Sequence, residues 1–160
     1  MPRIITLVGA AILFIAAGAP VQGAHFLPND NAAALKECGA CHLAFPPQML
    51  PAQSWQKIMA DLPHHFGEDA SLPAAVRAEI NAYLAGHAAD ADATRGGGRY
   101  FRGIPIDATP LRITQTAPWL RRHRGIAPGR FVDAEVKSPA NCQACHKGAG
   151  RGTFGEDDGE

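Results

Sequence analysis

The sequence predicts a mainly α-helical protein made of two small halves. Apolar residues recur at helical spacing, most clearly over residues 72–84, whereas the alternation typical of β-strands is not convincing anywhere. Three consecutive glycines, Gly96-Gly97-Gly98, lie in a stretch whose composition shifts, and such runs are typical of flexible connections. A chain of 160 residues suits one domain or two small ones.

The first 23 residues have the features of a leader for export. Arg3 supplies a positive start, residues 4–17 form a short apolar run, and residues 21–24 provide a small-residue exit. Cleavage after Gly23 or after Ala24 fits this pattern. The apolar run is shorter than the roughly 20 residues that a membrane span needs, so we expect an exported soluble protein and not an anchored one.

The charge balance argues against nucleic acid as a partner. The leader holds one of the 15 basic residues and none of the 15 acidic residues, so the mature chain carries 14 basic and 15 acidic side chains. Nucleic-acid binding favours a strongly basic face. The mature chain is also poor in large aromatic residues and rich in Ala, Gly and Pro, so side chains alone supply little material for a core.

All four cysteines belong to two copies of one motif. The copies are Cys38-Gly39-Ala40-Cys41-His42 and Cys142-Gln143-Ala144-Cys145-His146, each of the form C-x-x-C-H. This is the attachment signature of a c-type haem. The two thiols add to the two vinyl groups of one porphyrin, and the next histidine binds the iron. The sequence therefore predicts two covalently bound haem c groups, attached by Cys38, Cys41, Cys142 and Cys145, with His42 and His146 as proximal ligands.

Other uses of paired cysteines fit these motifs less well. A zinc ribbon needs two C-x-x-C pairs about 15–20 residues apart, whereas Cys38 and Cys142 lie 104 positions apart. A thioredoxin-like redox pair needs a βαβ context, and no strand pattern surrounds either motif. Disulfides are the strongest alternative, because exported chains often pair their cysteines. However, a disulfide does not require the histidine that follows each motif.

Helical patterns order the first haem-binding half, residues 24–89. Asn29, Asp30 and Asn31 provide an N-cap for a helix from Ala32 to about Gly39. We expect Ser54 to cap a second helix, and Ser71 with Pro73 to open a third that is followed by His87 as a buried or capping residue. The apolar faces are Trp55, Ile58, Met59 and Leu62 in the second helix, and Leu72, Val76, Ile80, Tyr83 and Leu84 in the third.

A linker at residues 90–103 leads into the second haem-binding half, residues 104–160. Phosphate binding by the three glycines is a weaker alternative, because the lysine and the strand–helix frame of a P-loop are missing. We expect Thr116 and Pro118 to start a short helix over residues 119–124, and Ser138-Pro139 to open a last helix into the second motif. The tail is expected to fray beyond Phe154.

Each haem iron needs a second axial ligand. The remaining histidines are His25, His64, His65, His87 and His123, and the methionines after the leader are Met49 and Met59. Because the second half has no methionine, His123 is the leading candidate there. Trp119 shares its helical face, and Arg121, Arg122 and Arg124 around it could pair with haem propionates. The alternative is that His123 is one more cation of a solvated basic run.

The candidates for the first iron are His64, His65 and His87, and the sequence barely separates His65 from His87. His25 is expected to be disordered and not a ligand. Metal-bound histidines usually donate their other N–H to a carbonyl or carboxylate group. We therefore expect a carbonyl of the Pro46-Pro47 turn to accept a hydrogen bond from His42, although these prolines would also serve as a simple helix stop.

The motifs and their surroundings resemble the small periplasmic dihaem cytochromes c over nearly the whole mature chain. The matching stretches are residues 37–42 with Pro46-Pro47, Leu50-Pro51, Ser54-Trp55, His65-Phe66-Gly67 with residues 70–72, and Ala82-Tyr83-Leu84; in the second half they are Ile113-Thr114, Pro118-Trp119, His123, residues 138–146 and residues 152–154. The resemblance implies a first half similar to a class I cytochrome c, a less regular second half, and irons with two histidine ligands. It favours His65 over His87.

These observations predict a periplasmic electron carrier and not an enzyme. The resemblance implies two kinds of redox partner, a membrane b-type cytochrome as donor and a small periplasmic cytochrome as acceptor. Two alternatives stay open: a peroxidase-like dihaem enzyme with one open iron, which requires His123 to be solvent-exposed, and a metal-free binding module stapled by disulfides.

Overall fold

The computed structural model describes residues 24–91, 98–105 and 107–155. The expectation of a mainly helical chain is confirmed: the described residues form short helices and 3-10 turns with one small sheet. The proposed leader, Gly96 and Gly97 of the linker, and residues 156–160 of the tail lie outside the described residues. Within the described ranges, no helix is long and apolar enough to cross a membrane.

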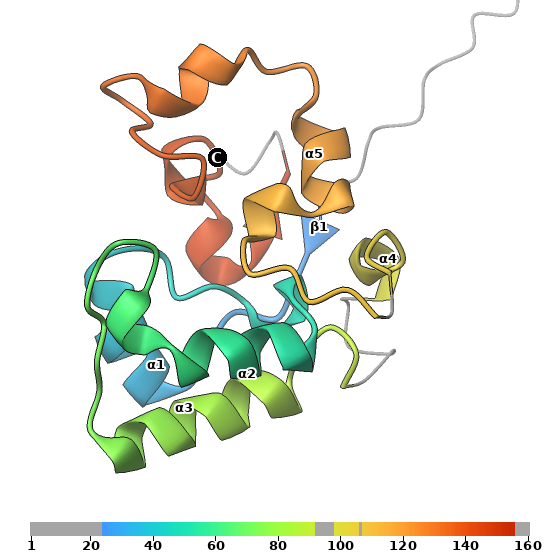
Figure 1. The fold of residues 1–160 in the computed structure, drawn as a ribbon. Coiled ribbons are helices and arrows are strands. Elements are labelled where there is room, and N and C mark those ends of the chain that lie inside the picture. The colour runs from blue at the N-terminus through green and yellow to red at the C-terminus, as the bar shows by residue number, and fades with distance from the viewer. Residues whose placement is uncertain (1–23, 92–97, 106, 156–160) are drawn as a thin grey trace, which may run out of the picture.

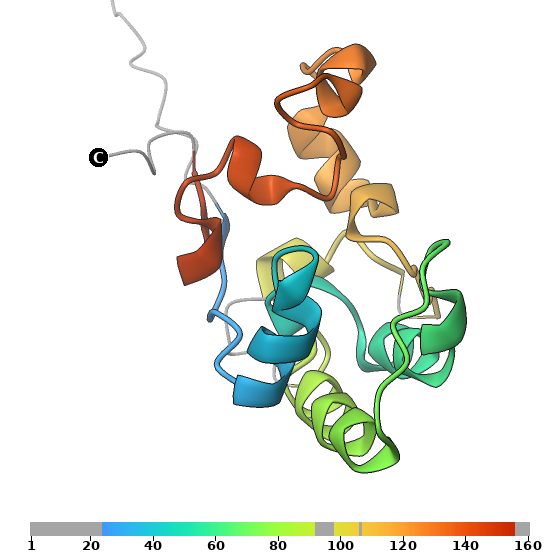
Figure 2. The ribbon, with the colours of Figure 1, turned by 90° about the vertical axis from the view of Figure 1, so that its left-hand side faces the viewer.

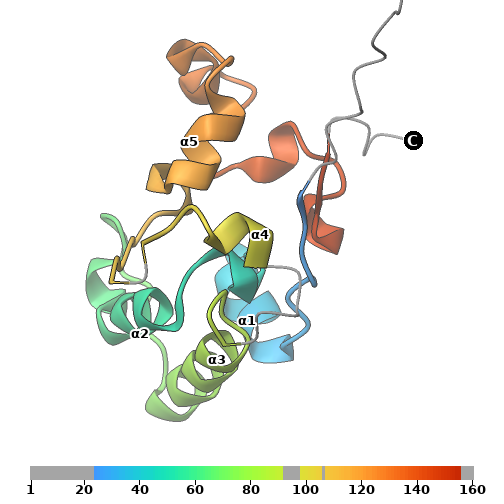
Figure 3. The ribbon, with the colours of Figure 1, turned by 90° about the vertical axis from the view of Figure 1, so that its right-hand side faces the viewer.

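The helices fall into two groups along the chain. In the first, α1 (Ala32–Glu37), α2 (Ala52–Ala60) and α3 (Ala74–Gly86) lie together, with α2 packed along α3 (Figure 1). The segment that begins with α5 (Ala117–His123) extends away from them (Figure 2). The short helix α4 (Gly98–Phe101) lies between α5 and the first group (Figure 3).

Helix α1 begins where the sequence predicted. The Asn31 side chain accepts a hydrogen bond from the backbone N–H of Ala34 at 2.8 Å, which satisfies one of the unpaired donors of the first turn. The helix ends at Glu37 and tightens into the 3-10 turn η1 (Cys38–Ala40). The first C-x-x-C motif is therefore wound into a single turn.

The expected N-cap of α2 is wrong. Ser54 lies inside α2 and is fully buried, and the carboxylate of Asp90 accepts the hydrogen bond from the Ala52 N–H at 2.7 Å. Helix α3 begins at Ala74, directly after Pro73, which opens the helix as expected. In α2 a residue far along the chain performs the capping, and local sequence cannot reveal it. Leu62 also lies beyond α2, in the 3-10 turn η3 (Leu62–His64), although it is buried as expected.

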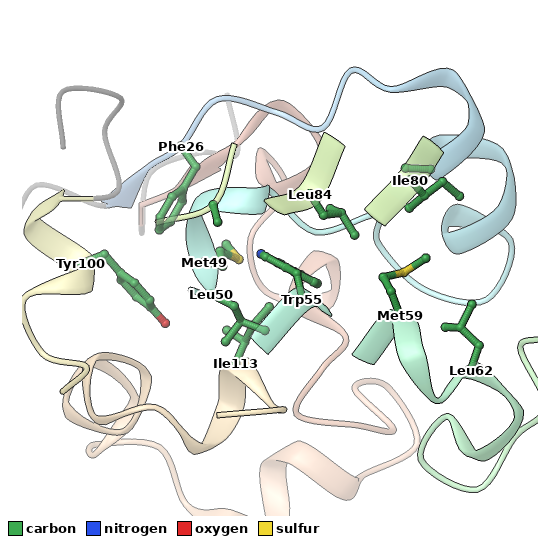
Figure 4. Packing of buried hydrophobic residues seen from close by; sticks show 12 residues of the cluster. Phe26, Met49, Leu50, Trp55, Met59, Leu62, Ile80, Leu84, Tyr100 and Ile113 are labelled. Atoms are coloured by element: carbon green, nitrogen blue, oxygen red, sulfur yellow. The ribbon is translucent and has the colours of Figure 1, made fainter. Parts of the chain in front are cut away.

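The apolar core lies between the first group of helices and α4. Its cluster runs from Leu62 and Ile80 at one end to Phe26 and Tyr100 at the other (Figure 4). Tyr100 belongs to the stretch predicted as linker, yet it is buried and contacts Phe26 edge to face at 5.3 Å. Ile113 is buried in the same cluster, so the segment that leads to α5 is attached to this core.

The second half is irregular, as expected, but its last predicted helix is absent. Helix α5 starts after Thr116, whose hydroxyl accepts a hydrogen bond from the Trp119 N–H at 3.4 Å. Residues 138–141 form turns, and the Ser138 hydroxyl accepts from the Ala140 N–H at 3.1 Å. Such local side-chain bonds compete with helix formation. The second motif therefore follows a turn, as the 3-10 turn η6 (Cys142–Ala144).

A two-stranded sheet joins the two ends of the described chain. Strand β1 (Ala24–His25) pairs antiparallel with β2 (Thr153–Phe154), and the Phe26 N–H donates to the Gly152 carbonyl oxygen at 2.8 Å. The expectation of no strands, and of a disordered His25, is wrong here because two-residue strands are too short to show alternation. Gly152 has a φ of +80°, and a Cβ atom there would lie 2.1 Å from the Phe26 carbonyl oxygen. Only glycine fits at position 152, where the two backbone segments approach each other this closely.

Candidate haem-binding sites

The four cysteines form no disulfide with one another. Cys38 and Cys142 are half-buried, whereas Cys41 and Cys145 are exposed. Burial raises the pKa of the Cys38 thiol and raises the pKa of the Cys142 thiol to about 11. Within the described ranges, no group of three or more His, Cys, Asp or Glu side chains could hold a metal ion by itself, so a zinc site at either motif is not supported.

In the first site, the ring of His42 is oriented by a local contact. Its Nδ1 bonds to the carbonyl oxygen of the next residue, Leu43, at 2.7 Å. The predicted bond to the Pro46-Pro47 turn is wrong, because the Pro47 carbonyl accepts the indole N–H of Trp55 at 2.7 Å. The Leu43 contact leaves the Nε2 of His42 as the nitrogen directed toward a metal.

His65 faces His42 across the first site. The two ring centroids lie 6.1 Å apart, and the ring planes differ by 24°. An ion bonded to one nitrogen of each ring at about 2 Å would hold the ring centres roughly 6 Å apart. His65 sits on a sharp turn in which Phe66 has a φ of 55° and Gly67 a φ of 108°. The two rings therefore have the spacing of an axial ligand pair.

The structure does not bring the other three histidines to either site. His64 is exposed and pairs with Asp61 at 2.7 Å. His87 ends α3, with its Nδ1 bonded to the Tyr83 carbonyl oxygen at 2.8 Å and its ring against the Tyr83 ring. This confirms its predicted place at the end of the helix. His25 lies exposed in β1.

In the second site, His123 faces His146. Their ring centroids also lie 6.1 Å apart, but their planes differ by 89°. The Nδ1 of His123 bonds to the Trp119 carbonyl oxygen at 2.8 Å, and the His123 and Trp119 rings stack with 4.2 Å between their centroids. This confirms the prediction that Trp119 and His123 share one face of the helix. The alternative, in which His123 belongs to a solvated basic run, is not supported. The Nδ1 of His146 lies 3.3 Å from the carbonyl oxygen of Gly155.

A cavity of about 820 Å³ opens between these two histidines and both thiols of the second motif. Its size falls within the range of about 300–1,000 Å³ typical of ligand pockets. Aromatic and aliphatic side chains form much of its wall: Phe26, Met49, Tyr100, Ile113, Trp119, Phe131 and Phe154. Two thiols, two facing imidazoles and flat apolar walls fit a covalently attached haem.

Sequence reasoning missed several aromatic residues at these sites. Phe45 stacks on His42 at 4.9 Å, Phe131 lies 5.2 Å from Trp119, and Phe154 lies 5.6 Å from His146. Phe45, three residues after the motif histidine, is close enough in sequence to have been proposed. Phe131 has no such signal, because the fold of the irregular segment brings it to Trp119.

The helical fold and the two sites define a c-type cytochrome with two haem groups. The sequence pattern of the family described as "Dihaem cytochrome c" matches residues 34–154. The chain therefore belongs to the dihaem cytochrome c family and carries two covalently bound haem c groups. Membership implies a function in electron transfer. No curated protein matches the chain.

Solved structures of the same family are similar over most of their length. A dihaem cytochrome c from Rhodobacter sphaeroides is 45% identical, with a TM-score of 0.72, over 80% of this chain and 99% of that chain. A second structure, of a protein purified from Rhodobacter sphaeroides, is 41% identical, with a TM-score of 0.65, over 80% and 100% of the two chains. A dihaem cytochrome c from Shewanella baltica OS155 is 37% identical, with a TM-score of 0.63, over 80% and 89%.

Proposed function

We propose that this chain is a periplasmic electron carrier whose two haem irons are each bound by two histidines. The observation that carries the proposal is that each motif histidine faces a second histidine with 6.1 Å between ring centroids. The haem groups supply one-electron chemistry when bound. The chain supplies the ligands, orients them and shields them from water.

The ligand pairs we propose are His42 with His65 and His146 with His123. Metals bind the neutral imidazole. Burial lowers the pKa of both His65 and His123, with smaller contributions from the facing histidine of each pair. A lowered pKa favours the neutral imidazole that a metal binds, although the bond to Trp119 acts in the opposite direction at His123. Backbone carbonyls hold three of the four rings, which fixes the nitrogen that faces the metal.

A carrier accounts for this geometry better than an enzyme does. An iron with two histidine ligands has no open coordination position for a substrate. The peroxidase-like alternative required a solvent-exposed His123, whereas this side chain is half-buried and stacked on Trp119. The placement of His123 therefore supports electron transfer without substrate binding.

Single replacements of the histidines test the ligand assignment. We expect His65→Ala and His123→Ala each to convert one of the two ferric haems from low-spin to high-spin, measured by optical absorption. His87→Ala is the matched control, because that ring bonds to Tyr83 at the end of α3 and should leave the spectrum unchanged. A wild-type protein with a high-spin haem that binds cyanide or peroxide would contradict the proposal.

We further propose that redox partners dock at the mouth of the second cavity. Arg121, Arg122 and Arg124 are exposed and line it, together with the exposed Ile126. In the described part of the chain, no carboxylate lies within ion-pair distance of these three arginines. An apolar contact ringed by charge is typical of transient protein interfaces. The partners suggested by relatives are a membrane b-type cytochrome as donor and a small periplasmic cytochrome as acceptor.

Neutralising the three arginines tests this docking surface. We expect the triple Gln variant to slow electron exchange with a small acidic cytochrome roughly tenfold or more at low salt, since charge steering changes association rates by about 10–10³-fold. The difference should shrink at high salt. Arg77→Gln on α3, an exposed site away from the cavity, is the control. An unchanged rate for the triple variant at low salt would rule out docking through these arginines.

A further inference from the structure

Arg112 connects the segment that leads to α5 with the turn that carries His65. Its guanidinium carbon lies 4.0 Å from the centre of the Phe66 ring. Phe66 in turn contacts the His65 ring, with 4.8 Å between centroids. Arg112 is thus a permanent positive charge one ring away from a ligand of the first haem.

The position of Arg112 is fixed although its side chain is exposed. Its backbone precedes the 3-10 turn η4 (Ile113–Gln115), whose first residue is buried in the core. The Arg112 carbonyl oxygen accepts a hydrogen bond from the Gln115 N–H at 3.1 Å. The guanidinium then packs on the face of Phe66, where a cation is attracted by the ring. A fixed backbone and an aromatic platform hold the charge in one place.

The turn beneath Arg112 has an uncommon backbone conformation. Phe66 has a φ of 55°, which is uncommon for an aromatic residue, and its side chain is 44% exposed. A conformation of this kind persists when surrounding contacts hold it. Arg112 supplies one such contact from a segment more than 40 positions further along the chain.

The charge of Arg112 is not cancelled locally. Among the described residues, no carboxylate lies within ion-pair distance of its guanidinium, and Asp61 is paired with His64. Only the Phe66 ring, which contacts both groups, lies between this charge and the His65 ring.

We propose that Arg112 raises the reduction potential of the haem bound by His65. This inference rests on the proposed ligand pair His42–His65. Reduction adds one electron to the site, and no bond at Arg112 forms or breaks. A fixed positive charge nearby stabilises the more negative, reduced state. Net charge and solvent exposure are among the factors that set the potential of a metal centre, and Arg112 places a positive charge in contact with this turn.

Redox titration of the complete protein tests the proposal with two variants. Arg112→Gln removes the charge and keeps a planar polar group, whereas Arg112→Lys keeps the charge and loses the planar stacking. We expect Arg112→Gln to lower the midpoint potential of one haem. At the potential that is the wild-type midpoint, the ratio of reduced to oxidised haem should fall threefold to tenfold, which corresponds to about 30–60 mV for one electron. Arg112→Lys should have a midpoint potential close to that of the wild type, and Arg77→Gln should leave both midpoint potentials unchanged.

Three further readouts make the outcome specific. The affected midpoint should belong to the haem whose low-spin spectrum is lost in His65→Ala, and the other midpoint should stay in place. The shift should diminish in 1 M salt, because an exposed charge is screened. Both haems of Arg112→Gln should stay low-spin, which separates a charge effect from loss of a ligand.

Two results would overturn the role of Arg112. The first is that, at low salt, both midpoint potentials of Arg112→Gln match those of the wild type. The other is an equal fall in Arg112→Lys, which would assign the effect to packing and not to charge. The ligand proposal fails differently: His65→Ala would then leave the low-spin spectrum intact, whatever the Arg112 variants do.

Discussion

The two haem sites have the same ligands by our proposal but are built in different ways. In the first, His42 is oriented by its own neighbour Leu43, and residues 46–51, which follow shortly after it in the chain, are all buried. In the second, His146 is oriented by Gly155, nine residues away, directly after the strand β2 that pairs with the start of the described chain. Residues 124–130 around the second site are all exposed.

This difference indicates what each site depends on. The first is placed by a packed core of helices and by contacts between neighbours in sequence. The second depends on closure between distant parts of the chain and on a group that fills a cavity of about 820 Å³. We therefore expect changes at the closing strands to damage the second site and spare the first.

The largest effect should come from Gly152→Ala. A Cβ atom at this position would lie 2.1 Å from the Phe26 carbonyl oxygen, and the φ of +80° disfavours alanine. The strain alone should cost about 1–3 kcal/mol of unfolding free energy, measured by urea denaturation of the holoprotein. The low-spin spectrum of the second haem should change as well, because β2 leads to the Gly155 carbonyl that orients His146.

Gly150→Ala is the matched control for this variant. It lies in the 3-10 turn η7 (Ala149–Arg151), which Gly152 caps, and its added Cβ atom would make only an ordinary contact of 3.6 Å with Gln143. We expect wild-type stability and spectra. Equal damage from both alanines, or damage confined to the first haem, would contradict the dependence of the second site on strand closure.

The orientations of the histidine rings should distinguish the two sites by electron paramagnetic resonance. The ring planes differ by 24° in the first pair and by 89° in the second. Parallel and perpendicular imidazole planes split the iron d orbitals differently, so the ferric protein should show two distinct low-spin signals. The more anisotropic signal should come from the perpendicular pair, His123 with His146, and should disappear in His123→Ala. Two identical signals in the wild type would show that the rings of the two pairs are oriented alike.

A smaller, pH-dependent effect should come from Tyr100→Phe. The buried Tyr100 hydroxyl bonds to the Thr116 hydroxyl at 3.2 Å and so ties α4 to the cap of α5. Loss of this bond should cost about 0.5–1.5 kcal/mol of unfolding free energy near neutral pH. Burial raises the pKa of Tyr100, with the Thr116 bond acting in the opposite direction.

The sign of the pH dependence follows from this raised pKa. The folded state holds the phenolic proton more tightly than the unfolded state, whose tyrosine has a pKa of about 10. The contribution of Tyr100 to the free energy of unfolding is therefore complete below pH 10, and it is lost as the pH rises through the pKa of Tyr100 in the folded state. Urea denaturation at pH 8 and pH 10.5 should show the advantage of the wild type over Tyr100→Phe narrowing at the higher pH. An advantage that widens would contradict the burial of this group.

Local spacing predicted a large part of the helical fold and of the second ligand pair. Asn31 caps α1 as expected, and Trp119 and His123 share a face because four residues make about one helical turn. The first ligand pair was not decided in this way. The residues alone barely separated His65 from His87, and of these two the fold brings His65 to face His42. The family resemblance favoured the same residue.

The errors have different physical causes. The distant Asp90, and not Ser54, caps α2, whereas His42 bonds to its immediate neighbour Leu43 and a local turn around Ser138 replaces the expected helix. The sheet between β1 and β2 was missed because each strand has only two residues.

The sequence by itself determined the chemistry of this protein, since covalent attachment depends on residues that are adjacent in the motif Cys38–His42 and its second copy. The tertiary structure decided which histidines stand opposite, how their rings are turned, and which charge lies beside them. Those properties depend on contacts between residues far apart in the chain, such as Arg112 with Phe66 and Phe26 with Gly152. Spacing along the sequence carries no record of such contacts.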